Sequence, residues 1–146
     1  MTKWLNLEHV KDICFVFAQT HLAFDEPIPP FETRFPGKIE AILAIPQQEF
    51  GGKRPYPKLT EQAGALFYSL IKEHPFLNGN KRIAVICLLF FLAINDSWLR
   101  LDWELLYETA VSVARSDPKK RGLVLKELSE MMTESLVKLE KSSPNN

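Results

Sequence analysis

Residues 83–94 read IAVICLLFFLAI and form the longest apolar run of the chain. A helix built from this run is apolar on every face, which predicts a buried central helix. The run has twelve residues, and a membrane-spanning helix needs about 20. We therefore expect no membrane association and a fold arranged around this one helix.

Helical segments precede the run. Asn6 is predicted to cap a helix that ends near His21, because apolar residues recur there at helical spacing. Prolines then enforce a loop, and a short helix is expected over residues 37–45. Residues 46–59 are broken by glycines and prolines and predict a loop or a short hairpin. The two aromatic side chains of that segment either grip a partner or pack on the surface.

The helix directly before the central one is expected to have Thr60 as its N-cap and Glu61 in its first turn. It is predicted to stop at His74, in the middle of its apolar stripe, because Pro75 disfavours helical geometry at the residue before it. The stripe consists of Ala63, Leu66, Phe67, Leu70 and Ile71.

Two helices are predicted after the central one. Asp102 is expected to cap a helix that ends near Arg115, and Asp117-Pro118 to open the last helix. No segment shows the pattern of a strand, so we expect an all-α fold, a compact bundle around the buried helix. The last helix is expected to carry Leu125, Leu128, Met132, Leu136 and Leu139.

The composition indicates one cytoplasmic domain. Of the 146 residues, 46% are hydrophobic, which is enough for one core. We expect a single domain over residues 1–140 and a disordered tail over residues 141–146. The N-terminus lacks the apolar region of a signal peptide, and Cys14 and Cys87 are expected to be buried free thiols. Basic and acidic side chains balance at 18 each, unlike the charge of a general nucleic-acid binder.

The loop before the central helix, residues 74–82, reads HPFLNGNKR and is the predicted functional centre. Lys81 and Arg82 fall in the first turn of the helix, where the helix dipole disfavours each cation by about 0.3–1 kcal/mol. No acidic residue lies nearby in the sequence to offset them. A bound phosphate resolves the conflict, because the free N–H groups of the helix end and both side chains bind anions.

Three further residues complete a predicted phosphate-transfer site. Gly79 permits close backbone approach, Asn80 adds an amide, and His74, expected to face inward across the loop, is a candidate base for an attacking hydroxyl. Each has a plainer interpretation: His74 as a core histidine, Asn80 as an N-cap, and the two cations as solvated or paired charges. Their coincidence within nine residues favours phosphoryl or nucleotidyl transfer.

The stretch HPFLNGNKR resembles the motif of the Fic/Doc (Fido) family, commonly written His-x-Phe-x-Asp/Glu-Gly-Asn-Gly-Arg-x-x-Arg. Its Lys-Arg ending is similar to the Doc, or death-on-curing, branch. The resemblance implies a small Fido-like helical bundle. It further implies that His74 is the general base and that Phe76 anchors the loop in the core. By the same resemblance, Gly79 and Asn80 shape the anion pocket and Arg82 holds phosphate.

Within this resemblance, Lys81 decides the reaction. Fic proteins have glycine there and transfer AMP, whereas in Doc-like proteins the lysine fills part of the pocket and reverses ATP, so that the γ-phosphoryl group is transferred. The implied function is a toxin that phosphorylates a Ser/Thr hydroxyl of a target such as elongation factor Tu. An antitoxin chain is the implied inhibitor in trans, and residues 46–59 are the implied target-docking flap.

Two positions depart from the Fic motif. Asn78 stands where the motif has the acidic residue that binds Mg²⁺. An amide oxygen ligates Mg²⁺ but supplies no charge, so we expect a weakened metal site. Val85 replaces the second arginine, which the Doc branch also lacks.

Three alternatives stay open. AMP transfer uses the same histidine and anion pocket. A degenerate relative without metal binds nucleotide or protein without catalysis. A helix-turn-helix protein places Asn80-Lys81-Arg82 at the start of its recognition helix, but the apolar run that follows and the neutral charge argue against direct DNA binding.

Overall fold

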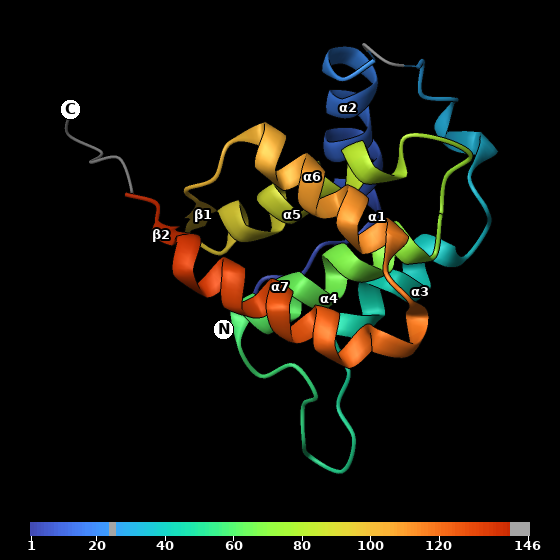
Figure 1. Cartoon of the computed structure of the whole chain (residues 1–146). Coiled ribbons are helices and arrows are strands. Elements are labelled where there is room, and N and C mark those ends of the chain that lie inside the picture. Colours follow the sequence, from blue (N-terminus) through green and yellow to red (C-terminus); the bar gives the residue numbers. More distant parts are fainter. Residues whose placement is uncertain (24–25, 141–146) are drawn as a thin grey trace, which may run out of the picture.

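The predicted buried helix lies at the centre of the molecule. The computed structural model describes residues 1–23 and 26–140. Helix α5, Asn80–Ile94, packs against α4 (Leu59–Lys72), α6 (Trp103–Arg115) and the N-terminal helix (Figure 1). The predicted all-α bundle is therefore confirmed, while the tail predicted over residues 141–146 lies outside the described residues. The buried residues of α5 are Arg82, Ile83, Ala84, Val85, Cys87, Leu88, Phe91 and Leu92.

The N-terminal helix is continuous but changes its winding. It consists of α1 (Leu7–His9), a π-helical segment (Val10–Phe15) and α2 (Val16–His21). Asn6 caps it as predicted, because its Oδ1 accepts a hydrogen bond from the His9 N–H at 2.8 Å. The predicted end at His21 is also confirmed. The π-helical winding has no counterpart in the predicted pattern, because apolar spacing defines a helix but not its exact pitch.

A proline-rich segment leads from α2 to α4. Its elements are a 3₁₀ turn (Phe31–Thr33), α3 (Lys38–Ala44) and a second 3₁₀ turn (Ile45–Gln47). Helix α3 confirms the short helix predicted over residues 37–45. In the following loop, Phe50 and Lys53 form a single antiparallel bridge, so the loop-or-hairpin alternative resolves into a loop that carries one bridge.

Helix α4 begins two residues earlier than predicted. Its N-cap is Lys58, so the prediction that Thr60 caps the helix is wrong. The Glu61 side chain accepts a hydrogen bond from the Lys58 N–H at 3.2 Å, as the third residue of a capping box does. Thr60 is buried instead, and its hydroxyl lies 3.2 Å from the hydroxyl of Thr133.

The loop over residues 46–59 and the loop over residues 74–82 lie at opposite ends of α4 (Figure 1). The helix has 14 residues and is therefore about 21 Å long at 1.5 Å per residue. The segment expected to dock a target is thus distant from the predicted functional centre. Residues 26–35 flank that centre instead, since the Phe35 N–H donates to the Pro75 carbonyl at 2.9 Å.

Asp102 caps α6 as predicted, whereas Asp117 caps a 3₁₀ turn that precedes the last helix, whose N-cap is Lys120. Asp102 accepts a hydrogen bond from the Leu105 N–H at 2.9 Å. Asp117 accepts one from the Lys119 N–H, also at 2.9 Å. The elements that follow α6 are a 3₁₀ turn (Pro118–Lys120) and α7 (Arg121–Ser135).

Two short strands contradict the prediction that the chain has none. Strand β1, Ser97–Leu99, pairs antiparallel with β2, Leu136–Lys138. Helix α7 therefore ends at Ser135, and Leu136 and Leu139 do not extend it as predicted. A three-residue strand shows too little alternation to be recognised, and this pairing joins segments that are distant in the sequence.

The two cysteines lie in the core as predicted. Cys14 and Cys87 are free and fully buried. A hydrogen bond between the two side chains and burial raise the pKa of Cys87 well above its ordinary value, which keeps the thiol protonated. None of the helices in the described part of the chain is long and apolar enough to cross a membrane.

Candidate active site

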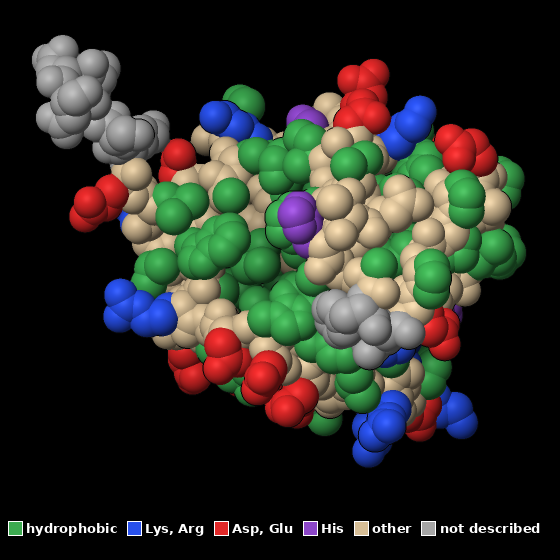
Figure 2. Space-filling view, turned by 90° about the horizontal axis from the view of Figure 1, so that it is seen from above, with side chains coloured by type: hydrophobic (Ala, Val, Ile, Leu, Met, Phe, Trp, Pro, Cys, Tyr) green, Lys and Arg blue, Asp and Glu red, His purple; other side chains and the backbone are tan. Residues whose placement is uncertain are grey.

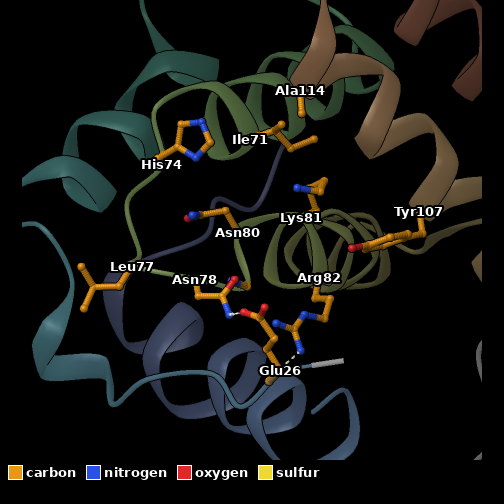
Figure 3. A pocket seen from close by; sticks show the side chains of 11 residues that line it. Glu26, Ile71, His74, Leu77, Asn78, Asn80, Lys81, Arg82, Tyr107 and Ala114 are labelled. Atoms are coloured by element: carbon orange, nitrogen blue, oxygen red, sulfur yellow. Dashed lines mark hydrogen bonds between the residues drawn. The ribbon is translucent and has the colours of Figure 1, made fainter. Parts of the chain in front are cut away.

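The chain turns sharply at His74, after α4 has ended. The prediction that α4 continues to His74 is wrong, because the helix stops at Lys72 and His74 adopts a left-handed φ of 46°. Such a conformation is uncommon for a residue with a side chain. His74 is exposed rather than buried in the apolar stripe of α4, and it lines a cavity (Figure 3). The imidazole is therefore accessible to an incoming hydroxyl.

Asn80 closes the loop on itself. Its side-chain amide donates to the Phe76 carbonyl and accepts from the Phe76 N–H, both at 2.9 Å. Phe76 is buried, and its ring packs against those of Phe15 and Phe31. The plainer interpretation of Asn80 as an N-cap does not hold, because Gly79 is the N-cap and Asn80 is the first helical residue.

Gly79 is required by both its conformation and its surroundings. Its φ is 82°, a region that side chains disfavour. A Cβ at this position would lie 2.9 Å from Cγ1 of Ile28, closer than two carbons can pack. Glycine thus lets the segment after α2 approach the start of α5.

Asn78 connects the loop to that same segment. Its Nδ2 donates to the carboxylate of Glu26 at 2.7 Å, and its Oδ1 accepts from the Gly79 N–H at 2.8 Å. The position that the Fic motif gives to an acid therefore holds an amide with a carboxylate beside it (Figure 3).

Arg82 is the more buried of the two cations, with 4% of its surface exposed. Its Nη1 donates to the backbone carbonyls of Leu22 and Glu26, the latter at 2.8 Å. These bonds fasten the segment after α2 to the first turn of α5. The fold thus brings an acidic residue beside Arg82 that is distant from it in the sequence.

A cavity of about 400 Å³ opens at the loop, within the range of about 300–1,000 Å³ that is usual for small-molecule sites. Every predicted site residue lines it except Phe76, which lies behind the loop in the core. The described lining residues are Glu26, Ile71, His74, Leu77, Asn78, Gly79, Asn80, Lys81, Arg82, Tyr107 and Ala114.

The lining of the cavity has polar and apolar parts, and Lys81 lies between Ile71 and Tyr107 in the view of Figure 3. Lys81 and Arg82 stand at the N-terminus of α5, where unsatisfied N–H groups and the helix dipole favour an anion. Ile71 of α4 and the side chains of Tyr107 and Ala114 from α6 form the apolar part. Such a lining offers cationic groups to a phosphate and an aromatic ring to a flat apolar group.

Sequence reasoning missed the lining residues outside the motif. Tyr107 and Ala114 are seven residues apart and so share one face of α6, but that pattern does not say which other element the face meets. Glu26 had no sequence signal, because its role depends on the path of the segment after α2.

One face of the molecule shows how its charged side chains are distributed. On the face shown in Figure 2, the basic side chains stand apart from one another, with acidic and apolar side chains between them. A DNA-binding surface instead needs a set of cations that follows the phosphate backbone. This face therefore gives no support to the helix-turn-helix alternative.

Metal donors at the cavity are few. In residues 1–23 and 26–140, no group of three or more His, Cys, Asp and Glu side chains could hold a metal ion. The Glu26 carboxylate nevertheless offers a hard oxygen donor beside the Asn78 side chain, whose own oxygen accepts from the Gly79 N–H. Such a donor fits Mg²⁺, which commonly takes one or two carboxylates and completes its shell with water and phosphate oxygens.

Comparison with known proteins gives two matches. A model of the Fic/DOC family matches residues 4–92. Over 68 residues, the chain is 38% identical to a protein named Toxin Doc from Mycolicibacterium smegmatis (strain ATCC 700084 / mc(2)155). The alignment covers 47% of this chain and 52% of the relative, so the chain spans about half the length of this curated relative. No solved structure matches the chain significantly.

Proposed function

The chain belongs to the Fic/DOC family, and from this premise we propose that it transfers the γ-phosphoryl group of ATP to a Ser/Thr hydroxyl of a target protein. The observation that carries the proposal is the arrangement of the cavity. Two cations and a helix N-terminus lie at its polar part, and an exposed histidine stands at its edge. Phosphoryl transfer depends mainly on such positioning and charge stabilisation.

The nucleotide is proposed to lie across the cavity with its phosphates at the start of α5. The α5 N–H groups, Lys81 and the cationic group of Arg82 bind the phosphate oxygens. The base lies toward Ile71 and Tyr107, where an aromatic ring provides a stacking surface. Lys81 takes the space that a glycine leaves open in the Fic motif, which supports phosphoryl transfer over AMP transfer.

His74 is proposed as the general base. The hydroxyl oxygen of the target attacks the γ-phosphorus, and the hydroxyl proton passes to the imidazole. The bond between the γ-phosphorus and the β–γ bridging oxygen breaks, and ADP leaves with that electron pair. The exposed position of His74 at the edge of the cavity supports this role, because the attacking group belongs to another protein.

Mg²⁺ is the proposed cofactor. Glu26 would hold it beside Asn78, and when bound it neutralises charge on the β- and γ-phosphates. With a single carboxylate among the described lining residues, we expect its binding to be weaker than in a site with an acidic motif residue.

The partners are proposed from the family. A toxin of this kind acts in the cytoplasm, where ATP and the candidate target, elongation factor Tu, are present. Its proposed inhibitor is an antitoxin chain that covers the cavity. The name of the mycobacterial relative, Toxin Doc, supports this assignment.

The direct test of the target uses purified elongation factor Tu, ATP and Mg²⁺, with the intact mass of the factor as the readout. We expect the mass to rise by one phosphoryl group with the wild-type chain and not with His74→Ala. His21→Ala is the matched control, because His21 is also exposed but does not line the cavity. An adenylyl group on the factor would contradict phosphoryl transfer.

Asn78 favours one second candidate, a module that binds nucleotide without transferring it. The amide supplies no charge to a metal, which is the expected condition of a degenerate site. Nucleotide binding without label on any protein of a bacterial lysate would establish this candidate in place of the first.

A further inference from the structure

We infer that Glu26 is the residue that supplies the negative charge for the metal ion bound with the nucleotide, in place of the carboxylate missing at Asn78. The inference rests on the proposed function, since it assumes a metal–nucleotide complex in the cavity. It assigns a metal-positioning role to a residue that lies outside the motif and belongs to a different part of the chain.

The charges of the cavity single out Glu26. Among the described residues that line it, Glu26 has the one carboxylate, and Lys81 and Arg82 are cations. A triphosphate and its metal need both signs, because the cations bind phosphate oxygens and the metal needs an anionic oxygen donor from the protein. Among the described lining residues, Glu26 is therefore the one side chain that can supply an anionic oxygen to the metal.

The geometry puts this carboxylate next to the motif position that lacks one. Glu26 Oε2 lies 2.7 Å from Asn78 Nδ2, so the two side chains meet at a single point of the cavity wall (Figure 3). That bond uses Oε2, which leaves Oε1 without a hydrogen-bond donor among the described residues. Asn78 Oδ1 is already bonded to the Gly79 N–H at 2.8 Å, so Glu26 Oε1 is the oxygen of this pair that can take a metal.

The backbone holds Glu26 at this place. Its carbonyl accepts a hydrogen bond from Arg82 Nη1 at 2.8 Å, and Ile28, two residues on, is buried against Gly79. Both contacts involve atoms outside the Glu26 carboxylate. The carboxylate can therefore be changed without loss of the contacts that position the segment.

Glu26→Gln separates a metal role from a purely structural one. The amide oxygen of glutamine can still accept the hydrogen bond from Asn78, so the hydrogen bond between the two segments is retained. The negative charge is lost. If Glu26 acts only through this hydrogen bond, the variant should bind the metal–nucleotide complex as the wild type does. If Glu26 is a metal ligand, the variant should bind it more weakly.

The experiment measures the affinity of the full chain for a non-hydrolysable ATP analogue by isothermal titration, once with Mn²⁺ and once with a chelator. Mn²⁺ serves as the probe because its electron paramagnetic resonance signal also reports its environment directly. We expect Mn²⁺ to raise the affinity of the wild type for the analogue. In Glu26→Gln this increase in affinity should be smaller by about tenfold or more. The metal-free affinity of the variant should stay the same or rise, because a negative charge near the phosphates is gone.

Two further variants complete the design. Glu32→Gln removes a carboxylate from the same segment, outside the cavity, and should behave as the wild type. Asn78→Asp added to Glu26→Gln returns a carboxylate to the adjacent position and should restore the effect of Mn²⁺.

The outcomes separate the inference from the function on which it rests. If Glu26→Gln keeps the full effect of Mn²⁺, or if Mn²⁺ does not tighten binding by the wild type, the inference is overturned while nucleotide binding stands. If the wild type binds no analogue under either condition, the proposed function fails and the inference fails with it.

Discussion

At the level of single residues, Lys81 contributes to ligand binding and Gly79 contributes to the packing of the protein. Lys81 acts on the ligand, because its side chain lines the cavity at the first turn of α5. Gly79 acts on the protein, because it lets Ile28 and Glu26 approach the loop. Changes at these two positions should therefore affect different measurements.

Lys81→Gly should change the reaction while the fold is retained. Loss of a cation that binds the phosphates should lower γ-phosphoryl transfer by about a hundredfold, and the opened space should allow AMP transfer to appear. The measurement compares α-labelled and γ-labelled ATP as donors. Unchanged γ-transfer would mean that Lys81 does not set the orientation of the nucleotide.

Gly79→Ala should lower the free energy of unfolding. The positive φ alone disfavours alanine by about 1–2 kcal/mol, and the contact with Ile28 at 2.9 Å should increase the loss. Gly52→Ala is the control, because Gly52 has a similar φ of 79° and a Cβ added there would meet no described atom within 4 Å. Equal losses for the two variants, measured by urea unfolding, would show that the contact with Ile28 has no effect.

At the scale of secondary structure, most of the predicted caps are confirmed, whereas elements that form by pairing of distant segments could not be predicted. The caps at Asn6, Asp102 and Asp117 could be predicted because each depends on a side chain and an N–H two or three residues away. Thr60 does not cap α4, because the helix already begins at Leu59 with Lys58 as its N-cap. The strands β1 and β2 were not predicted, because each forms only by pairing with the other, and the two are distant in the sequence.

Asp102→Ala tests how much the N-cap of α6 contributes to the stability of the fold. Loss of the hydrogen bond to the Leu105 N–H should reduce the free energy of unfolding by about 1 kcal/mol. Asp102→Asn should stay close to the wild type, since asparagine caps as well as aspartate. The free energies of unfolding of the two variants are measured with urea. An equal loss in both would show that the negative charge of Asp102, rather than its capping hydrogen bond, stabilises the helix.

At the scale of the molecule, the fold combines Ile71 of α4 and the motif loop with residues from two distant regions of the chain. The motif loop supplies the residues that could be predicted, from His74 to Arg82. Glu26 comes from the segment after α2, and Tyr107 comes from α6. No local pattern links these regions, so the sequence predicted the centre of the cavity but not its walls.

Helix α7 lies beyond the part matched by the family model, residues 4–92, yet it is part of the core. Met132 is fully buried, and its replacement by alanine should reduce the free energy of unfolding by about 2–5 kcal/mol. Met131→Ala, at a partly exposed neighbouring position, should have a smaller effect. A loss below about 1 kcal/mol for Met132→Ala would mean that α7 packs loosely on α4 and adds little to the fold.

The most direct measurement is the transfer of label from ATP to protein in a bacterial lysate, with Mg²⁺ and with ATP labelled at either the α- or the γ-phosphate. We expect label from the γ-phosphate on a lysate protein with the wild-type chain, and none with His74→Ala that retains the fold. Label from the α-phosphate alone would contradict phosphoryl transfer and establish AMP transfer. Label that persists with His74→Ala would remove His74 as the base.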